Sequence, residues 1–434
     1  MPMTSPLTAH PAAALKGRCV VPGDKSISHR ALIFGALAEG ETRIAGLLEA
    51  DDVMRTAAAV RALGASVEKE GASWIVTGAP WRSPDHPLYC GNAGTGSRLL
   101  MGAIAGQGIE AVLDGDRSLR SRPMGRILEP LTAMGVQSRS DDGKLPVEMR
   151  PGEPQAIRFA LPKPSAQIKS AVLLAALGAK GTTIVEEPVL CRDHTERMLP
   201  AFGVPVTLKN VGDGREIHLT GPATLKGTQL TVPADPSSAA FPVAAALLVE
   251  GSEVTVTGVL ANTTRTGLYE TLQEMGATLS LTNRREQGGE PVVDIVARFS
   301  NGLSGVTVPA ARVPSMVDEY PILAVIAAKA KGTTRMEGLA ELRVKESDRL
   351  SATAALLRTN GVACREGDDW LEVDGGDVPG GGKVETHDDH RIAMAALMLG
   401  LGASQPVSID DAEMIGTSFT GFVELMETLG ARIS

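Results

Sequence analysis

Residues 61–78, RALGASVEKEGASWIVTG, contain the pattern that decides the fold of this chain. A helix-like segment ends at Gly64, and two strand-like runs separated by a polar turn follow it. Glycine suits the position just after a helix, where a left-handed backbone turns the chain into the next strand. The same pattern recurs at Gly135, Gly203, Gly276, Gly361 and Gly430.

Each of these segments also contains an earlier helix that is rich in small apolar residues, as in SAVLLAALGAKGTTIVE (170–186). Apolar residues run almost all the way round these helices, which is typical of helices that are buried on every side. Repeats of roughly 70 residues are too long for a solenoid and suit a small βαβαββ motif. We therefore expect an α/β protein built from six βαβαββ repeats.

Two similar stretches divide the repeats into two sets of three. They are VVPGDKS (20–26) and TVPADPS (231–237). A chain of 434 residues exceeds the size at which one core usually keeps growing, so two domains are expected. We expect repeats one to three to form a domain over residues 25–234. Repeats four to six should form the other, over residues 1–24 and 235–434.

Composition excludes several classes of protein. A net charge of −9 and an aromatic content of 3% argue against a nucleic-acid binder. The four cysteines are scattered without a CxxC pair, which indicates a reducing compartment and offers no zinc site. The N-terminus lacks a signal-peptide core, and no apolar run is long enough to cross a membrane. We expect a cytoplasmic protein that does not bind membranes.

Polar clusters mark the beginning of each expected buried helix. Helix N-termini attract anions through their unpaired N–H groups and dipole. Cations in a first turn oppose that dipole, so their recurrence indicates that negative charge is bound there. The clusters are KSISHR (25–30), GNAGTGSR (91–98), SAQIKS (165–170), DPSS (235–238), DEYP (318–321) and HDDHR (387–391).

The charged stretch ELRVKESDRL (341–350) permits two interpretations. Glu346 and Arg349, three residues apart, could pair on a solvated helix face, as could Lys345 and Asp348. However, Lys345 and Arg349 lie four apart, which would place two cations on one face, and this arrangement favours an anion site.

Seven motifs, in order, resemble the 5-enolpyruvylshikimate-3-phosphate synthase family of 3-phosphoshikimate 1-carboxyvinyltransferases. They are PGDKSISHRAL, GNAGTGSR, RPMGR, SAQIKSA, DEYP, RVKESDR and DHRIAM. RDHTE, SAQIKSA and DEYPILA are similar to the class II bacterial branch. The resemblance implies the enolpyruvyl transferase fold: a two-domain inside-out α/β barrel with three repeats in each domain. It also implies an active site in the cleft between the domains.

The resemblance implies transfer of the enolpyruvyl group of phosphoenolpyruvate to the 5-hydroxyl of shikimate 3-phosphate. These two small anions would be the partners, and neither a cofactor nor a metal would take part. The residues expected to bind shikimate 3-phosphate are Lys25, Ser26, Arg30, Ser165, Ala166, Gln167, Arg192, Asp318 and Lys345. Those expected to bind phosphoenolpyruvate are Lys25, Gly94, Arg122, Gln167, Arg349 and Arg391.

Two carboxylates and Lys25 carry the expected catalysis. Asp318 resembles the residue that takes the 5-hydroxyl proton. Glu346 resembles the one that protonates the methylene carbon and later removes a proton. Ala166 stands where many family members have a second serine. The lysine that other branches carry near Thr417 is absent, and the sequence identifies no substitute for it.

Two alternatives remain open at this point. The UDP-N-acetylglucosamine enolpyruvyl transferases share the architecture but carry a cysteine near RSLRSRPM, where this chain has none. A non-catalytic anion-binding protein would gain nothing from Asp318 and Glu346 in its pocket. Tolerant class II members resemble GNAAT, so Gly94 in GNAGT predicts sensitivity to glyphosate. Nothing in the sequence demands more than a monomer.

Overall fold

The computed structural model describes residues 5–434, which form two compact units. Unit 1 comprises the chain up to Pro22, Pro233–Glu286 and Pro291–Ser434. Unit 2 comprises Gly23–Val232 and Gln287–Glu290. The domain boundaries expected at 24/25 and 234/235 fall within two residues of two of these divisions. They stay a prediction, and residues 1–4 of the first expected domain lie outside the described residues.

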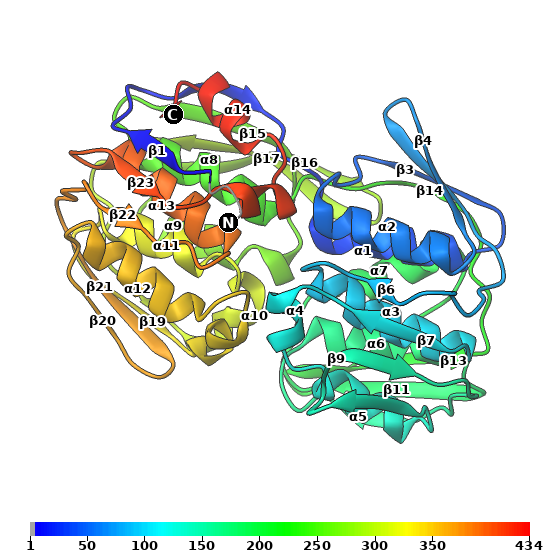
Figure 1. Cartoon of the computed structure of the whole chain (residues 1–434). Helices are drawn as coiled ribbons and strands as arrows, with labels where there is room; N and C mark the ends of the chain where they lie inside the picture. The colour runs from blue at the N-terminus through cyan, green and yellow to red at the C-terminus, as the bar shows by residue number, and fades with distance from the viewer. Residues whose placement is uncertain (1–4) are drawn as a thin grey trace. The chain divides into compact units, whose positions relative to one another are not determined.

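Unit 2 contains three four-stranded sheets, one for each of repeats one to three (Figure 1). The sheet of repeat one has the order β14 (Gln229–Thr231), β3 (Glu41–Ala45), β5 (Ser73–Thr77), β4 (Ser66–Glu70). The second has the order β6 (Leu88–Tyr89), β7 (Ala111–Asp114), β9 (Lys144–Met149), β8 (Ser138–Asp141). The third has the order β10 (Arg158–Ala160), β11 (Gly181–Glu187), β13 (Gly214–Gly221), β12 (Thr207–Val211).

Unit 1 contains the three sheets of repeats four to six. The first has the order β16 (Leu279–Gln287), β17 (Glu290–Arg298), β15 (Glu253–Leu260), β2 (Lys16–Cys19). The second has the order β18 (Thr307–Val308), β19 (Gly332–Glu337), β21 (Trp370–Gly375), β20 (Cys364–Glu366). The third has the order β22 (Lys383–Val384), β23 (Val407–Ile409), β1 (Leu7–His10), β24 (Arg432–Ile433).

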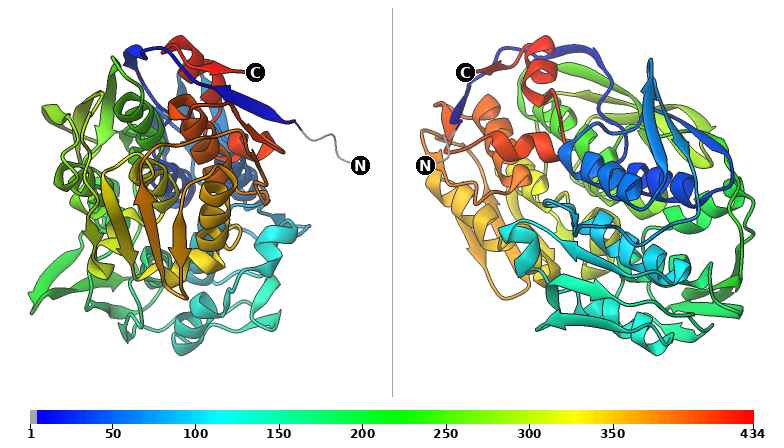
Figure 2. Two further views of the ribbon diagram at one scale, coloured as in Figure 1. Left: turned by 90° about the vertical axis from the view of Figure 1, so that its left-hand side faces the viewer. Right: turned by 45° about the vertical axis from the view of Figure 1, so that its right-hand side comes forward.

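Strands from distant parts of the sequence complete three of the six sheets. β14 pairs in parallel with β3, and β2 pairs in parallel with β15. β1 pairs antiparallel with both β23 and β24, so the N-terminal strand lies beside C-terminal elements (Figure 2). Each repeat therefore has its four-stranded sheet, but not always from its own contiguous segment.

Six buried helices form the centres of the two units. Those of unit 2 are α1 (Lys25–Leu37), α3 (Gly94–Gln107) and α6 (Ala166–Ala176). Those of unit 1 are α8 (Pro236–Leu248), α11 (Tyr320–Ala327) and α13 (His390–Gly402). Small residues permit very close packing: a Cβ atom at Gly102 of α3 would lie 2.2 Å from the carbonyl oxygen of Ala171 in α6.

The remaining helices cover the sheets or connect them. The α-helices are α2 (Asp51–Ala62), α4 (Arg117–Ser121), α5 (Gly125–Ala133), α7 (His194–Met198), α9 (Gly267–Glu274), α10 (Val313–Met316), α12 (Arg349–Thr359) and α14 (Phe422–Thr428). The 3₁₀ helices are η1 (Leu199–Phe202), η2 (Thr263–Arg265), η3 (Ala310–Arg312), η4 (Leu339–Val344) and η5 (Glu413–Thr417). Among residues 5–434, no helix has the length and apolar character needed to span a membrane.

The glycine pattern is confirmed by the backbone. All six glycines that define the repeats have positive φ angles, from 80° at Gly361 to 122° at Gly64. A side chain at these positions would be strained, which is why glycine recurs there. The buried helices also begin within the polar clusters expected from the sequence.

Candidate active site

The first turn of α1 holds two of the expected cations. Asp24 caps the helix by accepting from the Ile27 N–H at 2.8 Å. Lys25 Nζ lies 3.0 Å from a carboxylate oxygen of Asp52, which is buried at the beginning of α2. Asp52 therefore holds the lysine that is expected to reach both substrates, and sequence reasoning missed it because an acidic first turn is normally attributed to the helix dipole.

Arg30 is a buried cation with neutral hydrogen-bond partners. Its guanidinium donates to the Thr195 hydroxyl at 2.8 Å, the Ser170 hydroxyl at 2.7 Å and the Ser26 carbonyl at 2.8 Å. Burial, with a smaller contribution from the charge of Arg192, lowers the pKa of Arg30 to about 10, although nearby carboxylates such as Glu196 oppose the shift. Arg30 is still charged at neutral pH. A buried cation with hydroxyl and carbonyl partners, close to a second arginine, is suited to binding an anion.

Two arginines lie against Gly94 at the start of α3. A Cβ atom at Gly94 would lie 2.9 Å from an amino nitrogen of Arg98 and 3.0 Å from one of Arg122. Arg98 also donates to the Gln167 side chain at 3.1 Å, and Arg122 donates to Asn92. The structure therefore brings together Gly94, Arg122 and Gln167, which the sequence assigned to one ligand, and adds Arg98 to them.

The start of α6 is less polar than the family pattern. The Ser165 hydroxyl caps the helix by accepting from the Ile168 N–H at 3.4 Å. Ala166, the first helical residue, has no hydroxyl to offer, so only its backbone can contact a ligand. Gln167 donates to the Thr95 hydroxyl at 3.1 Å, which fixes its amide between α3 and α6.

Arg349 is the centre of the cluster in unit 1. It is 1% exposed and begins α12. Its guanidinium donates to both carboxylate oxygens of Asp389, at 2.9 and 3.2 Å, to Asp318 at 3.4 Å, and to Glu346. Burial alone would lower the pKa of Arg349, but these carboxylates outweigh it and raise the pKa above its usual value. Arg349 therefore brings both expected catalytic carboxylates together.

Lys345 lies near the same cluster, but not on the helix face that the sequence predicted. The expectation that Lys345 and Arg349 share a helix face is wrong, because α12 begins only at Arg349. Asp348 caps it by accepting from the Ser351 N–H at 3.1 Å. Lys345 lies before the helix in extended backbone, and its Nζ is 3.9 Å from Asp318. Burial lowers the pKa of Lys345.

Arg391 lies in the first turn of α13. Its N–H donates to Asp389 at 2.9 Å, and its guanidinium is 3.8 Å from a carboxylate oxygen of Glu319. Within residues 5–434 the guanidinium makes no hydrogen bond. The guanidinium of Arg391, which is expected to bind phosphoenolpyruvate, is therefore attracted by the charge of Glu319 without a hydrogen bond to it.

The two groups of side chains differ in their balance of charge. The group in unit 1 has more carboxylates than cations: Asp318, Glu319, Glu346 and Asp389 against Lys345, Arg349 and Arg391. The group in unit 2 is mostly cationic, with Lys25, Arg30, Arg98, Arg122 and Arg192. The unit 2 group is suited to binding phosphate, and the unit 1 group to transferring protons.

A separate group of potential metal ligands, Asp193, His194 and Glu290, belongs to unit 2. Arg197 lies 2.9 Å from Asp193 and 3.6 Å from Glu290. Because these carboxylates already have a cationic partner, the group does not have the excess negative charge that favours a metal ion.

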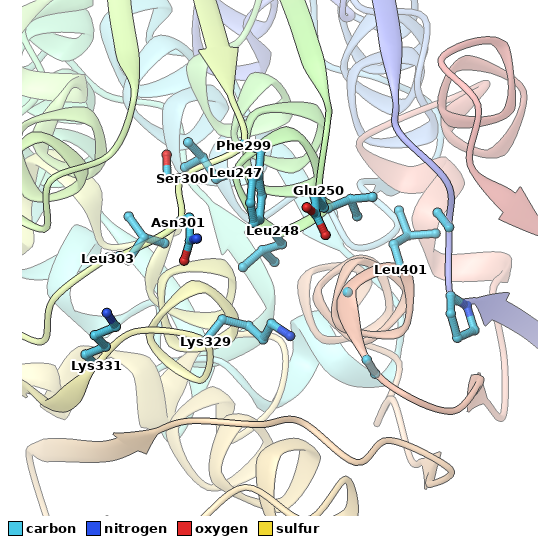
Figure 3. Close-up of a pocket in the computed structure, with 16 residues that line it drawn as sticks. Leu247, Leu248, Glu250, Phe299, Ser300, Asn301, Leu303, Lys329, Lys331 and Leu401 are labelled. Atoms are coloured by element: carbon cyan, nitrogen blue, oxygen red, sulfur yellow. The ribbon is translucent and has the colours of Figure 1, made fainter.

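The pocket in Figure 3 lies elsewhere in unit 1 and has a volume of about 370 Å³. Leu248 and Gly402, the last residues of α8 and α13, line it, as do Lys329 and Lys331 beyond the end of α11. None of the expected site residues lines it. These helices expose their negative dipole ends there, whereas the expected site residues lie where helices begin.

Comparisons with known proteins agree on one family. The model of EPSP synthase (3-phosphoshikimate 1-carboxyvinyltransferase) matches residues 9–426. The 3-phosphoshikimate 1-carboxyvinyltransferase of Methylorubrum populi is 57% identical over 99% of this chain and 97% of its own length. That of Gluconobacter oxydans is 52% identical over 100% of both chains. The solved EPSP synthase of Acinetobacter baumannii is 42% identical, with a TM-score of 0.87 over 99% of this chain and 100% of that one.

Proposed function

The chain belongs to the EPSP synthase family, and from this premise we propose roles for the side chains described above. The enzyme is a transferase of the shikimate pathway, which supplies the aromatic amino acids. It moves the enolpyruvyl group of phosphoenolpyruvate to the 5-hydroxyl of shikimate 3-phosphate. The products are 5-enolpyruvylshikimate 3-phosphate and inorganic phosphate.

The cationic group of unit 2 binds most of the negative charge of the substrates. Each phosphate carries a charge of about −1.5 to −2, and guanidinium groups bind phosphate and carboxylate oxygens in pairs. Shikimate 3-phosphate is bound by Lys25, Ser26, Arg30, Ser165, Gln167 and Arg192, the backbone of Ala166, and Asp318 and Lys345 of unit 1. Phosphoenolpyruvate is bound by Lys25, Gly94, Arg122, Gln167, Arg349 and Arg391.

Asp318 and Glu346 transfer the protons. Asp318 removes the proton of the 5-hydroxyl while the oxygen of that hydroxyl forms a bond to C2 of phosphoenolpyruvate. Glu346 donates a proton to the methylene carbon, which gives a tetrahedral intermediate. Glu346 then removes a proton from the resulting methyl group as the C–O bond to phosphate breaks, so that the double bond forms again. The leaving phosphate takes up the proton that Asp318 holds, which returns both carboxylates to their starting states.

One observation supports these two roles above all: the single guanidinium of Arg349 contacts both carboxylates. Arg349 therefore holds the two carboxylates at one guanidinium, where Asp318 can act as a base and Glu346 as an acid. Phosphoenolpyruvate competes for the same guanidinium. Binding of its anionic groups to Arg349 then releases the Glu346 carboxyl group from the guanidinium, so that Glu346 can act on the methylene carbon.

Release of inorganic phosphate from phosphoenolpyruvate and shikimate 3-phosphate, without added metal, tests this proposal. The wild-type protein should release phosphate, and Glu346→Gln should suppress release by about 100-fold or more. Glu337→Gln is the matched control, because Glu337 pairs with Arg335 on the partly exposed strand β19. No release by a wild-type protein that still binds both ligands would support a non-catalytic binding protein. Activity only with UDP-N-acetylglucosamine as the acceptor would support the related transferase.

We also propose that the enzyme works as a monomer in the cytoplasm, without a cofactor. The four cysteines are unpaired, as expected for a reducing compartment. A single species at the mass of one chain in light-scattering measurements would support the monomer.

A further inference from the structure

Glu319 is a buried carboxylate that the reaction itself does not use. It directly precedes α11 and is 3% exposed. One of its carboxylate oxygens accepts a hydrogen bond from the Ser237 hydroxyl, and the same oxygen lies 3.8 Å from an amino nitrogen of Arg391. A buried charge is costly, so its presence beside a ligand cation requires a reason.

A series of polar contacts that begins at Ser237 fixes the position of Glu319. Ser237 lies in the first turn of α8, and its hydroxyl also accepts from Arg265 at 3.1 Å. Arg265 donates to Asp235 at 3.0 Å, and the N–H of Asp235 donates to the Pro22 carbonyl at 2.9 Å. Pro22 is the last unit 1 residue before the chain crosses into unit 2, so the contacts lead from this crossing to Glu319.

Arg391 differs from Arg349 in how its carboxylate partner holds it. Asp389 occupies two donors of Arg349 at 2.9 and 3.2 Å. Glu319 stays at 3.8 Å from Arg391, beyond the usual length of a hydrogen bond, and attracts the guanidinium without occupying its donors. The donors of Arg391 therefore stay available for an incoming anion.

We propose that Glu319, anchored by Ser237, is a positioning residue for Arg391 in the binding of phosphoenolpyruvate; this rests on the proposed role of Arg391. The carboxylate orients the guanidinium by charge, and the Ser237 hydroxyl keeps the carboxylate from taking the donors itself. Ser237 lies in α8 and Glu319 directly before α11, in a different repeat, so their relationship appears only in the folded chain.

The test is steady-state phosphate release with each substrate varied while the other is saturating. Glu319→Gln keeps the shape of the side chain but removes its charge. We expect the KM for phosphoenolpyruvate to rise about tenfold, and the KM for shikimate 3-phosphate to change by less than about twofold. Glu337→Gln is again the control, since it removes a partly exposed carboxylate of the same unit that pairs with Arg335.

Ser237→Ala tests the anchor separately and serves if Glu319→Gln does not fold. The released carboxylate should approach Arg391 and occupy its donors, so the KM for phosphoenolpyruvate should again rise selectively. The double variant should match Glu319→Gln alone, because without the charge the anchor has nothing to restrain. An unchanged or lower KM for phosphoenolpyruvate, or equal changes in both KM values, would overturn the proposal. A wild-type protein that releases no phosphate would instead refute the proposed function.

Discussion

Arg349 donates to both carboxylate oxygens of Asp389, and both side chains are almost completely buried. Asp389 also accepts from the N–H of Arg391, so one carboxylate links the expected phosphoenolpyruvate arginines of α12 and α13. Arg349 holds the pKa of Asp389 below its usual value despite burial. Through Arg349, the position of the catalytic carboxylates thus depends on Asp389, which touches neither substrate in the proposed mechanism.

Asp389→Asn should therefore be strongly destabilising. Asparagine can still cap α13, so the change removes the charge while keeping the cap. Leaving Arg349 buried without its main partner should lower the free energy of unfolding by about 3 kcal/mol. Urea denaturation of the two proteins at pH 7 measures the difference. A loss below about 0.5 kcal/mol, the usual range for surface substitutions, would contradict the account of this pair.

Thr195→Val should weaken the binding of shikimate 3-phosphate. Valine keeps the shape of the buried side chain but removes the hydroxyl that accepts from Arg30 at 2.8 Å. We expect the KM for shikimate 3-phosphate to rise about fivefold while the KM for phosphoenolpyruvate stays nearly constant. Thr182→Val, on the exposed face of β11, is the matched control. Equal changes in both KM values would indicate general loosening of unit 2.

Gly94→Ala should separate glyphosate from phosphoenolpyruvate. The protein as it stands should be inhibited by glyphosate, because Gly94 leaves space beside the ligand arginines. The added methyl group would lie about 3 Å from Arg98 and Arg122, whose flexible ends must shift. The inhibition constant should rise about tenfold or more, with a smaller rise in the KM for phosphoenolpyruvate. Inhibition constants measured for both proteins decide this, and a parallel rise in the two constants would count against it.

Lys169→Met should destabilise the protein in a way that depends on pH. Lys169 is fully buried and pairs with Glu187 at 2.7 Å and Glu196 at 2.8 Å. Burial tends to raise the pKa of Glu187, but Lys169, together with Cys191 and Arg215, outweighs it, and the pKa lies below its usual value. The pairing therefore stabilises the fold above the unfolded pKa of about 4.3, and this contribution is lost as the pH falls through the folded pKa.

The measurement is urea denaturation of wild type and Lys169→Met at pH 7 and at pH 4. The difference in free energy of unfolding should be about 3 kcal/mol at pH 7 and smaller at pH 4, just below the unfolded pKa, where the loss of this contribution begins. A difference that does not vary with pH would show that lost packing, rather than lost charge, causes the effect.

The sequence predicted the repeats well because each depends on local rules. Gly64 and its five equivalents are required by backbone conformation, and the nearly continuous apolar pattern of helices such as α8 indicates burial directly. The strands that complete sheets from a distance were harder to predict. β1 and β2 are four-residue strands, LTAH and KGRC, too short to show an alternating pattern.

Cations in the first turn of a helix, such as Lys25 and Arg391, oppose the helix dipole, so the sequence alone identifies them as candidate site residues. The site was not predictable where one side chain holds another across repeats. Asp52, Asp389 and Glu319 each lie at the beginning of a helix or directly before one, where the sequence alone suggests a cap. Their partners come from other segments, and only the folded chain shows those contacts.

The N-terminal strand β1 finds both of its partners, β23 and β24, at the other end of the chain. On the ribosome, these partners emerge after the other strands of both units, so the sheet of repeat six cannot be complete until Ile433 has emerged. All but four residues of unit 2 form one continuous segment, Gly23–Val232, which has emerged long before. We expect protease resistance in nascent chains stalled after Leu260 to be confined to unit 2. Unit 1 should gain resistance only once Ile433 has left the exit tunnel, because β24 completes the sheet that β1 began.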